Sequence, residues 1–231
     1  MLVSVVIPTL NEAANILECV AAAWNGYGSD DVEIVVVDGG SSDATAALVP
    51  ADVRLLHSER GRGLQMNVGA STSRGDLLVF CHADSRLPAG WREAVVETLA
   101  HPGVIAGAFQ PLILPEWGLL RLVNRLRLPA HSMLFFGDQA MFMSREAFER
   151  VGGFPPIPLI EDVRMARALD PLGRLVRVPL RVITSSRRFR ERGFVRQTLH
   201  NIWMTIGHVY LGASPEKMAR WYSSSRNQRL R

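Results

Sequence analysis

The chain has 231 residues, of which 48% are hydrophobic, so it can bury one sizeable core without needing a second domain. Its net charge of +4 comes almost wholly from arginine, since Lys217 is the only lysine. The basic residues lack regular aromatic neighbours, and no zinc-finger or RNA-recognition signature accompanies them, which argues against a nucleic-acid partner. Arginine makes bidentate contacts with phosphate oxygens, which favours an anionic substrate or a membrane surface instead.

The same composition indicates a single domain in the cytoplasm. No apolar run reaches the length of a membrane span, and the N-terminal run leads into a strand and a turn instead of a cleavable signal. Cys19 and Cys81 stand in helix-like and strand-like contexts, which predicts reduced thiols packed in the core. No linker, repeat or low-complexity stretch interrupts residues 1–231.

Four apolar runs in the first hundred residues predict strands with helical stretches between them. They cover residues 2–7, 32–37, 53–57 and 77–81. This alternation predicts a mostly parallel, doubly wound sheet. Because the carboxyl ends of parallel strands meet at one edge, the loops that follow these runs should lie together.

Those loops carry polar residues. After the first strand, Asn11-Glu12 leads into a helix expected from Ala13 towards Trp24. The second strand ends at Asp38, followed by two glycines that allow tight turns and by Ser42 or Asp43 as a helix start. Taken alone, Glu12 is a favourable first-turn carboxylate and Asp38 a turn-forming residue, so other observations must assign them a function.

The fourth strand ends at His82-Ala83-Asp84, which is the most informative feature of the chain. An isolated carboxylate in such a loop places a hard oxygen ligand at the sheet edge, where a metal and a diphosphate can bind. The alternative is an aspartate that merely caps the next helix. Asp38 is expected at the same edge as Asp84.

The second half of the chain has a different pattern of predicted strands and helices. Residues 104–109 and 140–143 predict strands of a mixed sheet, separated by a helix-like stretch from Trp117 to Leu128. Within that stretch, Leu119, Leu122, Val123 and Leu126 share one helical face, and we expect them to pack in the core in preference to a membrane surface. The C-terminal aromatics alternate with Arg and His, which is consistent with a helix that covers the site or contacts lipid headgroups. These aromatics are Phe194, Trp203, Tyr210, Trp221 and Tyr222.

Five segments together resemble the family 2 glycosyltransferases, which have the GT-A fold. The residues that carry the resemblance are 5–12, 36–43, His82-Ala83-Asp84, Gly152-Gly153-Phe154 and Glu161-Asp162. A narrower likeness, in residues 82–85, 137–139 and 186–189, is to a small bacterial subgroup often labelled selenodomain-associated or arsenosugar-biosynthesis glycosyltransferases. The resemblance implies an α/β fold with a mostly parallel central sheet flanked by helices. It also implies a nucleotide-binding half (1–100), a mixed acceptor and catalytic half (101–190) and a C-terminal helical region (191–231).

The resemblance implies transfer of a sugar, with inversion, from a nucleotide-diphosphate donor, with UDP as the expected nucleotide. In the family the acidic pair after the Gly-Gly-Phe turn supplies the general base, which makes Asp162 the expected base here. Glu161 would then orient the acceptor or a neighbouring cation. Asp138, in Gly137-Asp138-Gln139, is the rival base. From spacing alone, Glu161 and Asp162 also suit a helix start, where the helix dipole favours carboxylates.

The resemblance also assigns the donor site. Residues expected to contact the donor are Pro8, Leu10, Glu12, Asp38, Arg62, Asn67, His82, Ala83, Asp84, Asp138, Gln139, Arg187 and Arg188. Asp84 is the expected ligand of a manganese or magnesium ion. The family usually has two acidic residues in this motif, and His82 replaces the first, which predicts weaker metal binding or a preference for manganese. Arg187 and Arg188 suit a loop that closes on the diphosphate.

Two alternatives remain open at the level of sequence. A nucleotidyltransferase would be expected to carry a glycine-rich, lysine-containing loop near its N-terminus, where this chain has Asn11-Glu12. A non-catalytic nucleotide-binding or membrane-surface module has only His82 in its favour, and Glu161-Asp162 argues against it. Three kinds of acceptor are compatible with the sequence: a polyprenyl phosphate, a small metabolite and a growing glycan. Peripheral contact with the inner face of the membrane and a homodimer are open as well.

Overall fold

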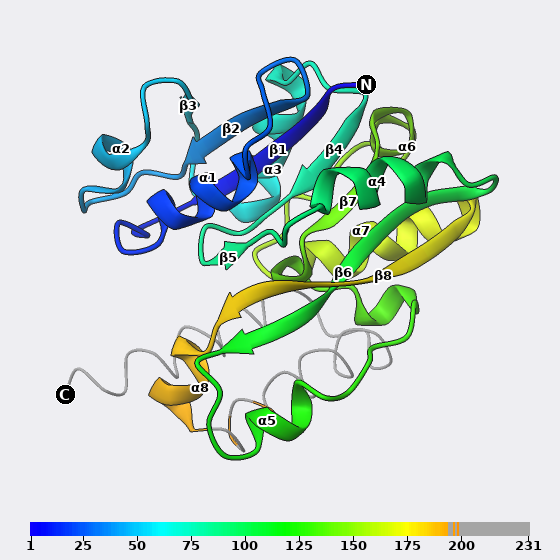
Figure 1. Cartoon of the computed structure of the whole chain (residues 1–231). Coiled ribbons are helices and arrows are strands. Elements are labelled where there is room, and N and C mark those ends of the chain that lie inside the picture. The colour runs from blue at the N-terminus through cyan, green and yellow to red at the C-terminus, as the bar shows by residue number, and fades with distance from the viewer. Residues whose placement is uncertain (194–195, 197, 199–231) are drawn as a thin grey trace.

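The strongest β-branched runs of the sequence form the buried centre of an eight-stranded sheet (Figure 1). The computed structural model describes residues 1–193, 196 and 198. Its parallel half consists of β3 (Arg54–His57), β2 (Val32–Asp38), β1 (Val3–Thr9) and β4 (Leu77–Phe80). Every residue of β1, β2 and β4 is buried. These strands confirm the four that the sequence predicts.

The second half of the chain makes the sheet mixed. Its strands are β7 (Met141–Ser144), β6 (Val104–Leu114), β8 (Arg174–Ser185) and the two-residue β5 (Ser85–Arg86), and the sheet order is β3-β2-β1-β4-β7-β6-β8-β5. Strand β7 runs antiparallel to both β4 and β6, whereas β6 and β8 are parallel. Strand β6 is longer than predicted because it pairs with β8 from Val104 to Leu114.

Side-chain alternation along the strands separates two hydrophobic layers. Val3, Val5 and Ile7 face the layer that contains α1 (Ile16–Trp24) and α4 (Trp91–Ala100). Val6 faces the opposite layer, which contains α3 (Arg62–Thr72), α6 (Arg145–Arg150) and α7 (Glu161–Leu169) (Figure 1). Shorter elements are α2 (Thr45–Leu48), α5 (Leu120–Val123), α8 (Arg187–Arg192), η1 (Ser132–Leu134), η2 (Gly137–Gln139) and η3 (Asp170–Leu172). The α/β architecture with a mixed second half agrees with the predicted fold class.

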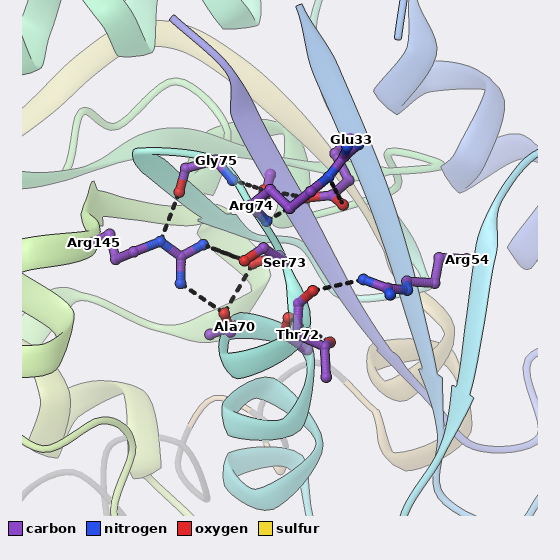
Figure 2. A network of polar contacts seen from close by, with 10 residues as sticks. Glu33, Arg54, Ala70, Thr72, Ser73, Arg74, Gly75 and Arg145 are labelled. Atoms are coloured by element: carbon purple, nitrogen blue, oxygen red, sulfur yellow. Dashed lines mark hydrogen bonds and ion pairs between the residues drawn. The ribbon is translucent and has the colours of Figure 1, made fainter. Parts of the chain in front are cut away.

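Close backbone approach and a half-buried arginine hold α3 in place. A Cβ atom added at Gly69 would lie 2.3 Å from Val6 Cγ1, so this glycine lets α3 approach β1 closely. Next to this glycine, Arg145 donates from Nη1 to Ala70 O (2.8 Å), from Nη2 to Ser73 O (2.9 Å) and from Nε to Gly75 O (2.8 Å), as Figure 2 shows. The guanidinium thereby satisfies carbonyl groups at the C-terminal end of α3. Both cysteines are buried and free, as predicted.

The predicted helix over residues 117–128 is wrong in its extent and in its buried face. Helix α5 covers only Leu120–Val123, and Leu119, Leu122 and Leu126 are exposed. The opposite side is buried because Asn124 accepts from Ile113 N (3.0 Å) and donates to Ile113 O (2.9 Å), which ties that side to β6. The predicted helix start at residue 13 also shifts to Ile16, after a turn in which Asn11 has a positive φ of 55°.

In the part of the chain that the structure describes, no helix combines the length and apolar character of a membrane span. The C-terminal aromatics named above lie outside the described residues.

Candidate functional site

The loops after β1 and β2 lie side by side at the carboxyl edge of the sheet. Thr9 pairs with Asp38 at the ends of the two strands. Beyond them, Asn11 N donates to Ser41 Oγ (2.9 Å), and Ser42 N donates to Asn11 Oδ1 (2.8 Å). Because β1, β2 and β4 are parallel, the loops that carry Glu12, Asp38 and Asp84 share one edge, as the sequence predicts.

The carboxylate of Asp38 organises the second loop. It is almost fully buried and accepts from Gly40 N (3.1 Å), Ser41 N (2.9 Å) and the hydroxyl of Ser41. A turn-forming aspartate makes bonds of this kind, so they support the interpretation of Asp38 as a residue that stabilises the turn. A contact of Asp38 with a nucleoside stays a prediction.

Gln65 is a structural residue of this edge that the sequence reasoning missed. It is buried in α3, and its Nε2 donates to Thr9 O and to Val37 O, both at 2.8 Å. The amide thus ties the ends of β1 and β2 together beneath the two loops. The signal that could have found it is a glutamine beside Met66 on the buried face of an otherwise amphipathic helix.

Glu12 and Arg187 meet across the edge, although 175 residues separate them. Glu12 Oε1 accepts from Arg187 Nη2 at 2.9 Å, and Glu12 Oε2 accepts from Asn15 at 2.5 Å. The pairing places the first residue of α8 beside the loop after β1. Arg187 therefore starts a short helix and not a loop, which corrects the sequence prediction. Arg188 follows it in α8.

Three other donor-site candidates, Pro8, Leu10 and Ala83, are buried or half-buried. Pro8 is buried within β1, opposite Val37, and Leu10 is half-buried. Ala83 is also buried and belongs to the hydrophobic layer beside α1, so its side chain contributes to packing. A role for these residues at the donor site would involve their backbone groups.

Asp84 and His82 differ in their surroundings. Asp84 is half-buried, and its carboxylate makes no hydrogen bond or ion pair with another residue of the described chain. The imidazole of His82 lies against η2, because a Cβ added at Gly137 would be 2.3 Å from His82 Nε2. No cluster of three or more His, Cys, Asp or Glu residues that could hold a metal occurs among the described residues. A metal ion at Asp84 stays a prediction, and a single carboxylate could hold one only together with ligands from a diphosphate and water.

Glu161 and Asp162 begin α7 and are both buried. Glu161 is fully buried, and its Oε1 lies 2.7 Å from Arg62 Nε. Burial raises the pKa of Glu161 to about 7; the neighbouring Asp162 charge also raises it, whereas Arg62 lowers it. Arg62, a predicted diphosphate contact, thus joins the start of α3 to the start of α7.

Asp162 faces η2. Its Oδ2 accepts from Gly137 N, and its buried Oδ1 has no hydrogen-bond partner among the described residues. A Cβ at Gly137 would contact His82 and also lie 3.0 Å from Asp162 Oδ2. Gly137 is therefore where the His82-Ala83-Asp84 loop and the Glu161-Asp162 pair come together, and the sequence could not show this.

Arg177 is the second residue that sequence reasoning missed. From β8 its guanidinium donates to Phe109 O (3.1 Å), Leu134 O (3.0 Å) and Gln139 Oε1 (2.8 Å), and it stacks over a phenylalanine ring. Desolvation lowers the pKa of Arg177 to about 10, and the negative charge of Asp138 opposes this shift. Gln139, a predicted donor contact, is buried and its Oε1 accepts from Phe136 N (3.1 Å). Its side chain therefore stabilises the turn from Phe136 to Gln139.

Asn67 is likewise engaged by the backbone. Its Nδ2 donates to Phe154 O (2.9 Å) and its Oδ1 accepts from Phe154 N (2.8 Å). The predicted cleft residue therefore holds the Gly152-Gly153-Phe154 turn against α3. A direct contact between Asn67 and a donor stays a prediction.

Backbone strain gathers at the same place. Of the four non-glycine residues with positive φ in the described chain, Asn11 (55°), Ala140 (47°) and Ile160 (60°) lie next to candidate site segments, and the fourth, Asn25 (40°), ends α1. For a β-branched residue such as Ile160 this conformation is costly, about 1–3 kcal/mol, and it persists only where the surroundings enforce it. Ile160 has this conformation immediately before Glu161 and Asp162, at the start of α7.

The arrangement combines the parts that diphosphate chemistry requires. One edge carries Asp84, whose carboxylate is unpaired within the described chain, and Arg187, which pairs with Glu12. Behind it lie two buried carboxylates, one with a pKa near neutrality. Such a set can stabilise a leaving diphosphate and accept a proton from an attacking hydroxyl.

Comparison with known proteins gives a consistent result. The family model described as Glycosyl transferase family 2 matches residues 4–153. Glycosyltransferase AglE of Haloferax volcanii is 32% identical over 111 residues, which cover 44% of this chain and 36% of that protein. A PGL/p-HBAD biosynthesis glycosyltransferase of Mycobacterium bovis is 33% identical over 117 residues, covering 47% of this chain and 43% of that protein. The matched region spans less than half of either relative.

Solved structures share the fold. The mannosyltransferase PcManGT of Pyrobaculum calidifontis, in complex with GDP-Man and Mn2+, superposes with a TM-score of 0.63 at 27% identity over 87% of this chain and 64% of that one. TarS of S. aureus gives a TM-score of 0.65 at 16% identity, covering 90% of this chain and 66% of that one. Glucosyl-3-phosphoglycerate synthase of Mycobacterium tuberculosis, in complex with Mn2+, UDP and glucosyl-3-phosphoglycerate, gives 0.61 at 22% identity, covering 89% and 80%. These similarities confirm the predicted GT-A fold.

Proposed function

This chain belongs to glycosyl transferase family 2, and we propose on that basis that it transfers a sugar with inversion from a nucleoside-diphosphate donor to an acceptor hydroxyl. The observation that carries the proposal is the meeting of two segments at Gly137. The His82-Ala83-Asp84 loop arrives from β4, and the Glu161-Asp162 pair arrives from α7. A carboxylate suited to a diphosphate-bound cation and a carboxylate suited to proton removal are thereby held in one region.

We assign Asp162 as the general base. Its Oδ2 is fixed by Gly137 N, which leaves the buried Oδ1 to accept the proton of the acceptor hydroxyl. The deprotonating oxygen attacks the anomeric carbon from the face opposite the leaving group. The bond from that carbon to the diphosphate oxygen breaks, and the nucleoside diphosphate leaves with the electron pair.

Asp84, Arg187 and Arg62 are the groups proposed to act on the diphosphate. Asp84 would hold a divalent cation, which supplies positive charge to the diphosphate oxygens as negative charge develops there. Arg187 is already at the edge through its ion pair with Glu12. Arg62 lies behind the edge and holds Glu161. The solved complexes named above contain Mn2+ together with UDP or GDP-Man, which supports a donor of this class.

The nucleotide and the narrower subgroup stay proposals. UDP is our choice of nucleotide, and GDP is the alternative that the mannosyltransferase complex suggests. Release of a nucleoside diphosphate, and not of pyrophosphate, would separate a glycosyltransferase from a nucleotidyltransferase.

Calorimetric titration with UDP and GDP, with and without Mn2+, tests the donor site. We expect binding that requires the metal and that Asp84→Ala weakens at least tenfold, about 1.4 kcal/mol. Asp76→Ala, which removes an exposed carboxylate just before β4, is the matched control. If neither nucleotide binds wild-type protein, the proposed function is wrong.

Turnover of UDP-glucose and GDP-mannose with a panel of acceptors tests the base. We expect Asp162→Asn to lower turnover by about 10²–10⁴ while UDP affinity stays within about threefold, since the base acts only in the chemical step. Asp138→Asn tests the rival base in the same assay. Full turnover in Asp162→Asn would show that Asp162 is not the general base.

A further inference from the structure

Three leucines on one short segment face solvent. The large hydrophobic side chains that are exposed in the described chain include Leu119 (54%), Leu122 (58%) and Leu126 (62%). Their spacing of three and four residues places them on one helical face. We call residues 117–128 the leucine segment.

The segment is firmly held, so this exposure is a property of the fold. Leu120 is fully buried, and Asn124 makes two bonds to the Ile113 backbone and a third to Glu116 Oε1 (2.8 Å). Backbone bonds from Val123 N to Leu119 O (3.1 Å) and from Leu126 N to Val123 O (3.0 Å) extend the helical turn beyond α5. Figure 1 shows α5 beyond the ends of β6 and β8, away from the parallel half of the sheet.

Positive charge predominates around the three leucines, and the one carboxylate beside them in the chain, Glu116, accepts a hydrogen bond from Asn124. Arg121, Arg125 and Arg127 are exposed, and residues 117–131 contain no Asp or Glu. Apolar side chains flanked by arginines match the two parts of an anionic lipid surface. The leucines suit the boundary between headgroups and acyl chains, and the guanidinium groups suit the lipid phosphates.

We propose that the leucine segment is a docking surface for an anionic lipid bilayer. It makes no use of the donor site, so it stands independently of the proposed function. Charge argues against two other occupants. A second copy of the chain would bring three arginines against three arginines. The last residues of this chain, 199–231, carry five basic residues against one acidic residue, so they too would meet like charge.

Vesicle flotation of the full chain tests the proposal. We expect wild-type protein to float with phosphatidylcholine vesicles that contain about 30% phosphatidylglycerol, and much less with phosphatidylcholine alone, because each arginine near an anionic surface adds about fivefold to binding. Binding should weaken as salt is added.

Two variants locate the contact. The triple variant Leu119→Ser, Leu122→Ser and Leu126→Ser should lower vesicle binding at least about tenfold, since the apolar contact is lost. Leu17→Ser is the matched control because Leu17 is also an exposed leucine (48%) but lies on α1. Arg121→Glu with Arg125→Glu should remove the preference for anionic vesicles. Thermal unfolding of each variant should match wild type, because every substituted side chain is exposed.

Three results would overturn the proposal. In the first, the triple variant binds vesicles as well as wild type. In the second, wild-type protein binds no vesicle and elutes as a dimer, whereas the triple variant elutes as a monomer, which identifies a second copy as the occupant. In the third, no vesicle binds and the triple variant gains trypsin cleavage at Lys217, which identifies the C-terminal residues as the occupant.

Discussion

Glu161 provides a quantitative test of the buried acidic pair. The pKa of its carboxyl rises from 4.5 to about 7, chiefly through burial. The folded protein therefore binds this proton more tightly than the unfolded chain does. The resulting stability is fully present below about pH 4.5 and is lost as pH rises through about 7. The difference between the two pKa values, at roughly 1.4 kcal/mol per pKa unit, amounts to about 3 kcal/mol.

Urea unfolding of wild type and Glu161→Gln between about pH 5 and pH 8 measures this term. Because the amide introduced in the variant cannot titrate, the stability of wild type relative to the variant should fall by about 2–3 kcal/mol across that range. In thermal unfolding the same change corresponds to roughly 4–12 °C for a chain of this size. Glu97→Gln, which removes an exposed carboxylate on α4, controls for the loss of one surface charge.

Parallel stability curves for wild type and Glu161→Gln, within about 0.5 kcal/mol, would refute the reasoning. That outcome would mean that Arg62 holds Glu161 ionised throughout, so that burial does not control its proton. Arg62→Met then gives an internal check. Removing the cation should move the loss of stability to higher pH, because Arg62 lowers the pKa of Glu161.

Three further perturbations follow from the contacts. Arg177→Lys should cost about 2–4 kcal/mol in urea unfolding, because lysine cannot reproduce the forked bonds to the carbonyls of Phe109 in β6 and Leu134 in η1; a loss below about 1 kcal/mol would mean that these bonds are dispensable. Gly69→Ala should cost about 1–3 kcal/mol, because the added methyl would lie 2.3 Å from Val6 Cγ1 in the contact of α3 with β1; a neutral effect would mean that α3 can move. Gly137→Ala should lower turnover at least about tenfold, because the added methyl would lie 2.3 Å from His82 Nε2 and 3.0 Å from Asp162 Oδ2 and so displaces both, and unchanged turnover would contradict the assigned geometry.

Much of the fold could be read from local sequence. The β-branched runs of β1 and β2 are buried on both faces, which is why they appear as continuous apolar segments. The parallel connection of these strands with β4 then required Asp38 and Asp84 to lie at one edge. The resemblance to family 2 glycosyltransferases pointed to the acidic pair at the start of α7, and the role of Asp162 as base stays a prediction.

The leucine segment shows where local pattern fails. Leucines at helical spacing predicted a buried face, yet Leu119, Leu122 and Leu126 are exposed. Hydrophobic periodicity identifies a face but not the direction in which that face points. Here Asn124 decided the direction, because its amide binds the backbone of β6 at Ile113. The partner of Asn124 lies outside residues 117–128, so the pattern of that segment alone does not give the direction.

The sequence by itself determined which segments form the parallel strands and which polar residues follow them, because strand formation and loop position depend on near neighbours. Only the tertiary structure decided that Arg62 pairs with Glu161, that Arg177 supports η2, and that Gly137 joins the His82 loop to Asp162. These pairs come from elements far apart in the chain. Their contacts depend on how α3, α7 and β8 pack, and so does the pKa of Glu161, since burial of a carboxylate is a property of the assembled core.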